Sequence, residues 1–144
     1  MLNKSKSAEI IFFQNTRIKN TCKTISTIPG INRVEEINIL GVILADCFTM
    51  NSHINEVCSS AAKSLYAIKL MKSHGMDIVS TTDVFHATVI SRLMYCCPTW
   101  WGFTTADQRK RLQAVVNRAF KWGLISPSDL TLEQLVQRRE NRIF

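Results

Sequence analysis

The first third of the chain carries short apolar runs separated by turn residues, a pattern typical of β-strands. Residues 9–13 form a compact apolar run, which predicts a buried strand. Residues 21–28 are rich in threonine and isoleucine and predict an edge strand, with Pro29-Gly30 as the turn that follows. Residues 37–44 are apolar on both alternating sides, so we expect one strand that is covered on both faces.

From residue 51 onward, the spacing of apolar positions changes to that of α-helices. Apolar residues fall on one face through residues 51–73, which predicts an amphipathic helix that ends at His74-Gly75. Ser80 and Asp83 have the spacing of a capping box and predict the start of a second helix. That helix is apolar all round, as in the interior of a bundle, and is expected to end just before Pro98.

Two further helices are predicted toward the end of the chain. One spans residues 105–122 and ends at Gly123; the other begins near Thr131, which has a glutamine three residues later to complete a capping box. Together the two patterns predict an α+β fold, with a small β segment in residues 1–47 and a bundle of three or four helices in residues 48–144.

The composition favours a nucleic-acid partner and argues against a membrane or disulfide-bonded protein. The 144 residues carry 18 Lys+Arg against 11 Asp+Glu, a formal charge of +7, which favours a polyanionic partner such as RNA or DNA. The five cysteines have no CxxC spacing, which indicates a reducing compartment. No stretch reaches the roughly 20 apolar residues of a spanning helix, so we expect an intracellular protein of the cytoplasm or nucleus that does not enter a membrane.

The third predicted helix carries the strongest physical indication of a binding surface. Four of its basic residues fall within about 100° of one another on a helical wheel. They are Lys110, Arg111, Arg118 and Lys121. Such a face could follow a phosphate backbone, and it could equally be the solvated side of an amphipathic helix. By contrast, three lysines of the first helix are dispersed and read as ordinary surface: Lys63, Lys69 and Lys72.

Two other groups of residues allow a binding interpretation and a structural one. Trp100, Trp101 and Phe103 could stack on bases, but aromatic residues after a buried helix more often fill the core, and we favour the core. The histidines and cysteines offer no spacing typical of a metal site, and we expect no cofactor.

Several short motifs follow one another along almost the whole chain. They are Leu2-Asn3-x-x-Lys6-Ser7-x-Glu9-x-x-Phe12, Leu40-Gly41-Val42-x-x-Ala45-Asp46, Ser91-Arg92-Leu93-x-Tyr95, Pro98-x-Trp100-Trp101-Gly102-Phe103, Arg111-Leu112-Gln113-x-Val115-x-Asn117-x-Ala119 and Leu132-Glu133-Gln134-Leu135. In order and spacing, these motifs resemble the end of the palm and the thumb of jockey-type, LINE-like non-LTR retrotransposon reverse transcriptases.

The resemblance implies roles for three residues of the β segment. Lys6 matches a lysine that lies near the phosphates of the incoming nucleotide, and Leu40-Gly41 matches a hairpin that grips the primer end. Each residue also has a simpler interpretation. Lys6 could be an ordinary surface lysine, and Gly41 could be a bulge or a packing glycine.

The chain departs from the family in the residues that carry out the chemistry. Polymerisation in that family depends on aspartates that together hold two magnesium ions. Here the aspartates are isolated from one another along the chain: Asp46, Asp77, Asp83, Asp107 and Asp129. The resemblance therefore implies a fragment that is not an enzyme by itself and keeps only weak, non-specific binding of RNA or DNA.

Two alternatives remain open from the sequence. The chain could be a helical protein-interaction module, or a nucleic-acid-binding module that has been put to a new use. The resemblance further implies that the strands have lost their neighbours in a palm sheet, so we expect an exposed β edge, which favours self-association.

Overall fold

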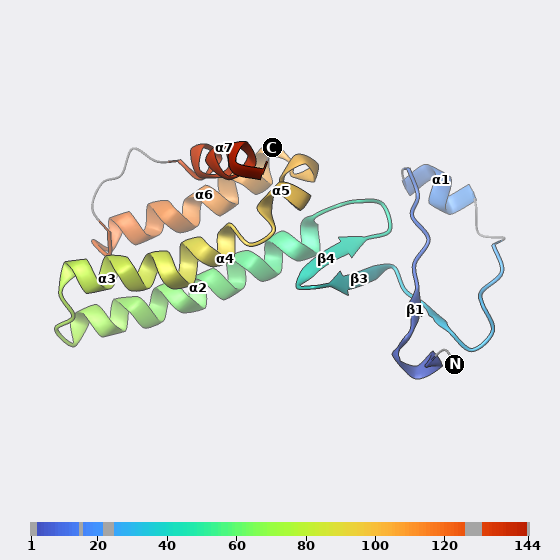
Figure 1. The fold of residues 1–144 in the computed structure, drawn as a ribbon, viewed down its shortest axis with the longest axis horizontal. Helices are drawn as coiled ribbons and strands as arrows, with labels where there is room; N and C mark the ends of the chain where they lie inside the picture. Colours follow the sequence, from blue (N-terminus) through green and yellow to red (C-terminus); the bar gives the residue numbers. More distant parts are fainter. Residues whose placement is uncertain (1–2, 15, 22–24, 126–130, 144) are drawn as a thin grey trace. The chain divides into compact units, whose positions relative to one another are not determined.

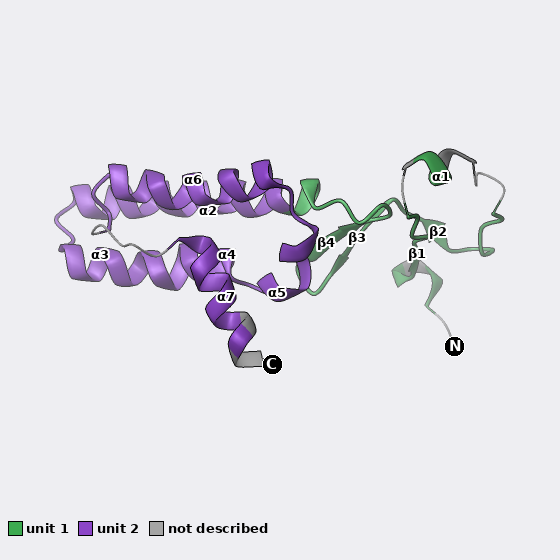
Figure 2. Ribbon diagram, turned by 90° about the horizontal axis from the view of Figure 1, so that it is seen from above, with its two compact units in different colours: residues 1–53 green, residues 54–144 purple. Residues whose placement is uncertain are grey.

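The computed structural model describes residues 3–14, 16–21, 25–125 and 131–143 and has an α+β fold in which helices predominate (Figure 1). The chain divides into two compact units, residues 1–53 and residues 54–144 (Figure 2). In chain order the elements are η1 (Lys4–Lys6), β1 (Ala8–Glu9), α1 (Thr16–Thr21), β2 (Asn32–Arg33), β3 (Glu36–Ile39), β4 (Val42–Ala45), α2 (Asn51–Ser73), α3 (Ile78–Phe85), η2 (His86–Ile90), α4 (Ser91–Leu93), α5 (Cys97–Trp100), η3 (Trp101–Phe103), α6 (Ala106–Lys121) and α7 (Leu132–Ile143).

The centre of the first unit is a β-hairpin and not the single strand that the alternation of apolar residues predicts for residues 37–44, and its turn lies at Leu40-Gly41, where the family resemblance implies a hairpin. Strands β3 and β4 pair in antiparallel register, with Ile39 opposite Val42. Leu40 and Gly41 form the two-residue connection, with φ angles of 50° and 86°. Positive φ at both positions is the geometry of the tight turns that join twisted strands. The prediction was wrong because apolar residues on both sides of the turn hide it in the alternation pattern.

The predicted strand at residues 9–13 is much shorter than expected. Only β1, at its start, is a strand, and it pairs in parallel with β2. The following residues have no regular structure, although the Phe13 amide donates to the Asp46 carbonyl at 2.8 Å. A single hydrogen bond to the end of the hairpin thus takes the place of a longer ladder.

The predicted edge strand at residues 21–28 is wrong where the structure describes it. Helix α1 covers its first residue, residues 22–24 lie outside the described part, and residues 25–28 form no strand. The Arg33 guanidinium donates to two carbonyl oxygens of that segment, at 2.7 and 2.8 Å, and to the Glu9 carboxylate at 3.1 Å. These carbonyls therefore bind a side chain instead of a neighbouring strand.

An ion-pair cluster attaches α1 to the end of the hairpin. Lys19 lies 2.7 Å from the carboxylates of both Glu35 and Asp46. Burial alone would raise the pKa of Asp46, but hydrogen bonds from Lys19 and Cys47 hold it below its usual value. Asp46 is thus a buried, charged group that stabilises this unit through its partners.

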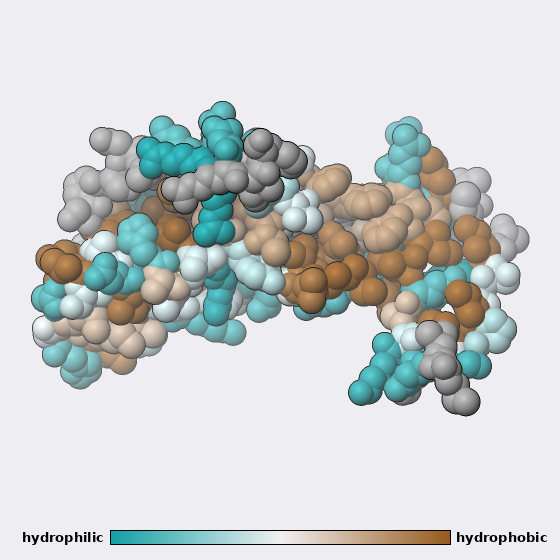
Figure 3. Space-filling view, in the orientation of Figure 1, coloured by the Kyte–Doolittle hydropathy of each residue, from teal (hydrophilic) through white to brown (hydrophobic). Residues whose placement is uncertain are grey.

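The hairpin also presents apolar side chains to solvent. Brown, hydrophobic residues gather over β3 and β4 in Figure 3. Ile39 is about half exposed and Leu40 is 85% exposed at the tip. The self-association expected from an exposed β edge stays a prediction.

In the second unit, helix α2 has the bounds and the buried face that its apolar spacing predicts. The side chains on that face are all buried: Val57, Ala61, Leu65 and Ile68. Its end lies at His74-Gly75, where the glycine has a φ of +98°. This left-handed conformation is the usual way in which a glycine ends a helix.

The second predicted helix begins three residues before the expected capping box. Asp77 caps α3, because its carboxylate accepts a hydrogen bond from the Ser80 amide at 2.9 Å. Ser80 and Asp83 both lie inside the helix and do not cap it. Asp77 has the β-region backbone that a cap requires, with φ −67° and ψ 163°.

This helix also ends earlier than predicted. It passes through a π-helical turn, η2, and finishes with α4 at Leu93. Cys96 then takes a left-handed backbone with a φ of 47°, and Pro98 lies in the first turn of α5. Pro98, which the sequence predicts to end one helix, instead lies at the start of the next helix, where its missing N–H leaves no hydrogen bond unmade.

The remaining two helices begin where the sequence predicts, and both begin at capping boxes, of which the sequence predicts the one at Thr131. At the start of α6, the Thr105 hydroxyl accepts from the Gln108 backbone N–H at 3.3 Å. The Gln108 side-chain oxygen accepts in turn from the Thr105 backbone N–H at 2.8 Å. The corresponding bonds of Thr131 and Gln134 precede α7. The predicted helix starts near Thr105 and Thr131 and the predicted capping box at Thr131 are confirmed, while the capping box at Thr105 is an addition from the structure.

Helices α2 and α6 run parallel to each other. Near the start of α2, Asn55 accepts from Arg111 at 2.7 Å. At the other end, the Lys72 ammonium donates to the Gly123 carbonyl. Since α3 follows a tight turn after α2, α3 and α4 return alongside it, and Arg92 of α4 donates to the Ser60 hydroxyl. Because α6 is joined to α2 near both of its ends, one side of α6 lies against the other helices of this unit (Figure 2).

Candidate nucleic-acid interface

Helix α6 is strongly two-sided, and its inner side is packed in the core. The inner side is formed by Leu112, Val115, Val116 and Ala119, which are all buried. Burying such a stripe fixes the rotation of the helix about its own axis. The opposite side of α6 must therefore face solvent.

All four basic residues predicted to share that opposite side are exposed. We call them the basic face of α6: Lys110, Arg111, Arg118 and Lys121. Hydrophilic residues gather over α6 and α7 in Figure 3. One acid lies on the same side: Asp107, whose carboxylate is 3.9 Å from the Lys110 ammonium. The pair is largely in water, so this contact restrains Lys110 only weakly.

Two of the three α2 lysines that the sequence assigns to ordinary surface instead hold the end of α6. The Lys72 ammonium donates to the Gly123 carbonyl, and the Lys69 ammonium lies 4.7 Å from the centre of the Trp122 ring. A cation at this position also compensates the partial negative charge at the C-terminus of a helix. Of these three lysines, only Lys63 fits the surface interpretation, since it is exposed and does not contact the end of α6.

The three candidate residues of the β segment belong to the other compact unit. Lys6 is exposed in the short helix η1, and Leu40 and Gly41 form the tip of the β3–β4 hairpin. Gly41 is therefore a turn glycine and neither a bulge nor a packing glycine, and the contact of this hairpin with a primer end stays a prediction. The structure brings the basic face of α6 together on one helix, while these three residues lie in the first unit.

The tryptophans after α4 belong to the core, as favoured from the sequence. Trp100 is fully buried, and its indole N–H donates to the Tyr95 carbonyl at 3.0 Å. Trp101 is only 8% exposed. Phe103 differs, because about half of its side chain is exposed.

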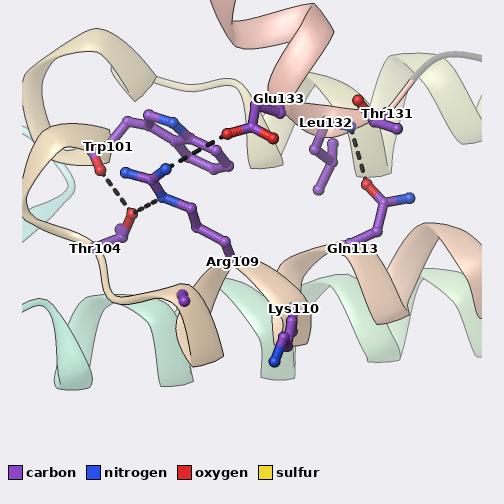
Figure 4. Close-up of a pocket in the computed structure, with 9 residues that line it drawn as sticks. Trp101, Thr104, Arg109, Lys110, Gln113, Thr131, Leu132 and Glu133 are labelled. Atoms are coloured by element: carbon purple, nitrogen blue, oxygen red, sulfur yellow. Dashed lines mark hydrogen bonds and ion pairs between the residues drawn. The ribbon is translucent and has the colours of Figure 1, made fainter.

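A pocket that the sequence did not reveal lies between the first half of α6, the Trp101–Thr104 segment and the start of α7 (Figure 4). At its centre is Arg109, a base outside the basic face. Its guanidinium lies 5.0 Å from the centre of the Trp101 ring, donates to the Thr104 hydroxyl at 3.0 Å, and is 3.5 Å from the Glu133 carboxylate. The sequence could not indicate this cluster, because its members come from three separate elements.

Within the described ranges, no three or more histidine, cysteine, aspartate or glutamate side chains gather where they could hold a metal ion. Several acids there have structural contacts instead. Asp46 pairs with Lys19, and Asp77 caps α3. In the same part of the chain, no helix combines the length and apolar character needed to cross a membrane.

No protein-family model matches the chain, and neither the curated proteins nor the solved structures contain a match to it.

Proposed function

We propose that the helical unit binds the phosphate backbone of RNA or DNA through the basic face of α6, and that the chain corresponds to the palm end and thumb of a non-LTR retrotransposon reverse transcriptase. One observation carries the binding proposal. Four bases lie exposed on one side of a 16-residue helix whose other side is anchored in the core. A helix anchored in the core keeps these charges on one side, where they can neutralise neighbouring phosphates of a nucleic-acid backbone.

The contact proposed here is with phosphates and is blind to sequence. Lysine and arginine on long, exposed side chains neutralise phosphates without reading base edges. The origin in a reverse transcriptase rests on the order of the sequence motifs, which is independent of the charge argument. Either part of the proposal can therefore fail while the other stands.

A helical protein-interaction module remains the second candidate, and one observation favours it. Apolar side chains at the end of α2 and the start of α3 are exposed in the same region of the unit: Tyr66, Leu70, Met71, Ile78 and Val79. Exposed apolar side chains that cluster in this way are a known property of protein interfaces. Binding there would not depend on salt in the manner expected of phosphate contacts.

The salt dependence of binding tests the phosphate contact. We expect the purified chain to bind duplex DNA or RNA with a dissociation constant of about 10⁻⁴–10⁻⁶ M, without preference for sequence. If all four bases contact phosphates, the slope of log affinity against log salt on duplex DNA should be about −3.6, at 0.9 per contact. Fluorescence anisotropy across a salt series measures it, and an affinity that does not change with salt would contradict the proposal.

The proposal assigns no polymerase chemistry to this chain alone. Two observations support this part of the proposal: the aspartates are separated along the sequence, and Asp46 and Asp77 make structural contacts. Two-metal phosphoryl transfer requires carboxylates that converge on one site. We expect no primer extension by the purified chain with magnesium or manganese, and extension that EDTA abolishes would refute this part.

A further inference from the structure

We propose that the pocket beside α6 receives an unstacked base of a single-stranded nucleic acid. The inference rests on the proposed function, because it assumes that a strand lies along the basic face of α6. It adds a site for the base to a site for the phosphates.

The pocket has the size and walls of a site for a small planar group. Its volume is about 530 Å³, within the range of about 300–1,000 Å³ common to ligand sites. The apolar part of the lining comes from Trp101, Ala106 and Leu132. Its polar part includes the Arg109–Glu133 pair, whose two side chains point toward one another in Figure 4.

The Arg109 guanidinium is held as a flat surface on which a base can stack. One side of it covers the Trp101 ring at 5.0 Å, and Thr104 and Glu133 restrain its ends. Trp101 is 8% exposed, whereas 37% of the Arg109 side chain remains exposed. A group that enters the pocket therefore meets the guanidinium plane before the indole. Stacking of unpaired bases on arginine planes is a common mode of single-strand recognition.

The charges in the pocket favour a base over a phosphate. Glu133 compensates the charge of Arg109, and its own side chain is 71% exposed. A phosphate would be repelled by this carboxylate, whereas a neutral base would not. Gln113 contributes little to recognition, because its side-chain oxygen already accepts from the Leu132 amide at 2.9 Å and its nitrogen donates to Asn117 at 3.1 Å. Binding should thus rest mainly on stacking, with little discrimination between bases.

Lys110 connects the pocket to the basic face. It lines the pocket and belongs to the face, and in Figure 4 it points away from the Arg109 group. A strand whose phosphate lies at Lys110 therefore has its neighbouring base near the mouth of the pocket. A base inside a duplex is stacked and paired and could not enter, so the site selects single strands.

An abasic strand separates the base contact from the phosphate contact. We would compare a single-stranded DNA 12-mer with a 12-mer of the same length and charge made of abasic tetrahydrofuran units, by fluorescence anisotropy at one salt concentration. The intact strand should bind at least about fivefold more tightly, the lower end of the effect of stacking one base. Equal binding of the two strands would overturn the pocket and leave the phosphate contact intact. Binding of neither strand would overturn both proposals.

The variant Arg109→Lys tests the residue itself, because it keeps the charge and removes the plane. It should reduce the preference for the intact strand to near one, while the abasic strand binds as it does to the unmodified chain. Circular dichroism reports whether the variant is folded. A folded Arg109→Lys protein that keeps the full preference would show that the base lies elsewhere and would overturn the inference.

Discussion

Replacing all four residues of the basic face of α6 by glutamate is expected to remove most nucleic-acid binding. The change substitutes repulsion for attraction at each phosphate contact, so the affinity should fall by about 100-fold or more and the salt slope should move from about −3.6 toward zero. Anisotropy titrations at three or more salt concentrations would measure both quantities. The slope is the more informative of the two, because it counts phosphate contacts independently of the absolute affinity.

A charge-matched control decides whether the position of the bases matters. The double reversal Lys110→Glu with Lys121→Glu can be compared with Lys63→Glu with Arg138→Glu, which changes two exposed bases of the same unit off that face. Lys69 and Lys72 are unsuitable controls, because they hold the end of α6. Equal losses in two folded variants would show that binding depends only on overall charge.

Folding must be measured for the quadruple variant and for both double variants, because the reversal of Arg111 in the quadruple variant also removes its hydrogen bond to Asn55. Acids near the C-terminus of a helix oppose its dipole by about a few tenths to 1 kcal/mol each. Lys121 lies in the last turn of α6, so its reversal carries this cost, whereas Lys110 lies nearer the start. Circular dichroism with urea unfolding separates a loss of stability from a loss of contact.

Trp100→Ala is expected to destabilise the helical unit by about 3–5 kcal/mol. The side chain is fully buried, and its removal leaves a large cavity together with a Tyr95 carbonyl that has lost the indole N–H at 3.0 Å. Domains are typically stable by only about 5–15 kcal/mol, so a large part of the stability would be lost. The midpoint of urea unfolding, followed by circular dichroism at 222 nm, would measure the change.

Phe103→Ala provides the comparison within the same aromatic turn. Phe103 is 53% exposed, and substitutions at such surface positions usually change stability by about 0.5 kcal/mol or less. If Phe103→Ala cost as much as Trp100→Ala, the packing described for the two residues would be wrong. A small effect of Trp100→Ala would contradict it in the same way.

The parts of the fold that could be predicted are those governed by local chemistry. The helix start near Thr105, the capping box at Thr131 and the stop at Gly75 each depend on residues close in the chain, and all three are present. The apolar spacing of α2 also predicted its buried face. The face of an amphipathic helix that packs on the core can be identified without knowing which elements it packs against.

The failures are in places where the spacing of apolar positions carries no information about the local structure. The alternation of apolar positions did not reveal the hairpin, which only the family resemblance implied, because the turn consists of Leu40 and Gly41 and leucine is an unusual residue at a positive φ. The edge strand was wrong because Arg33, at a distance in sequence, binds the carbonyls of residues 25 and 26. Neither effect leaves a signal in the spacing of apolar positions.

The candidate site also has one part that could be predicted from the sequence and one part that could not. The basic face of α6 follows from the 3.6-residue period of a single helix, so its exposure could be predicted from the sequence. The pocket around Arg109 could not, since it needs Trp101 from the preceding turn and Glu133 from α7. In the sequence, Arg109 is only one more base in a basic helix.

The parallel arrangement of α2 and α6 has a consequence for the way in which the unit folds. Two helices that are consecutive in the chain usually pack antiparallel, so their contacts join residues that are close in sequence. Helices α2 and α6 are parallel and are separated by several other helices. Here the bonds that join the pair, Arg111 to Asn55 and Lys72 to Gly123, span 56 and 51 residues. Long loops must close before such bonds can form, and this entropy cost slows folding. The α2–α3 hairpin can therefore assemble first, and the docking of α6 completes the unit.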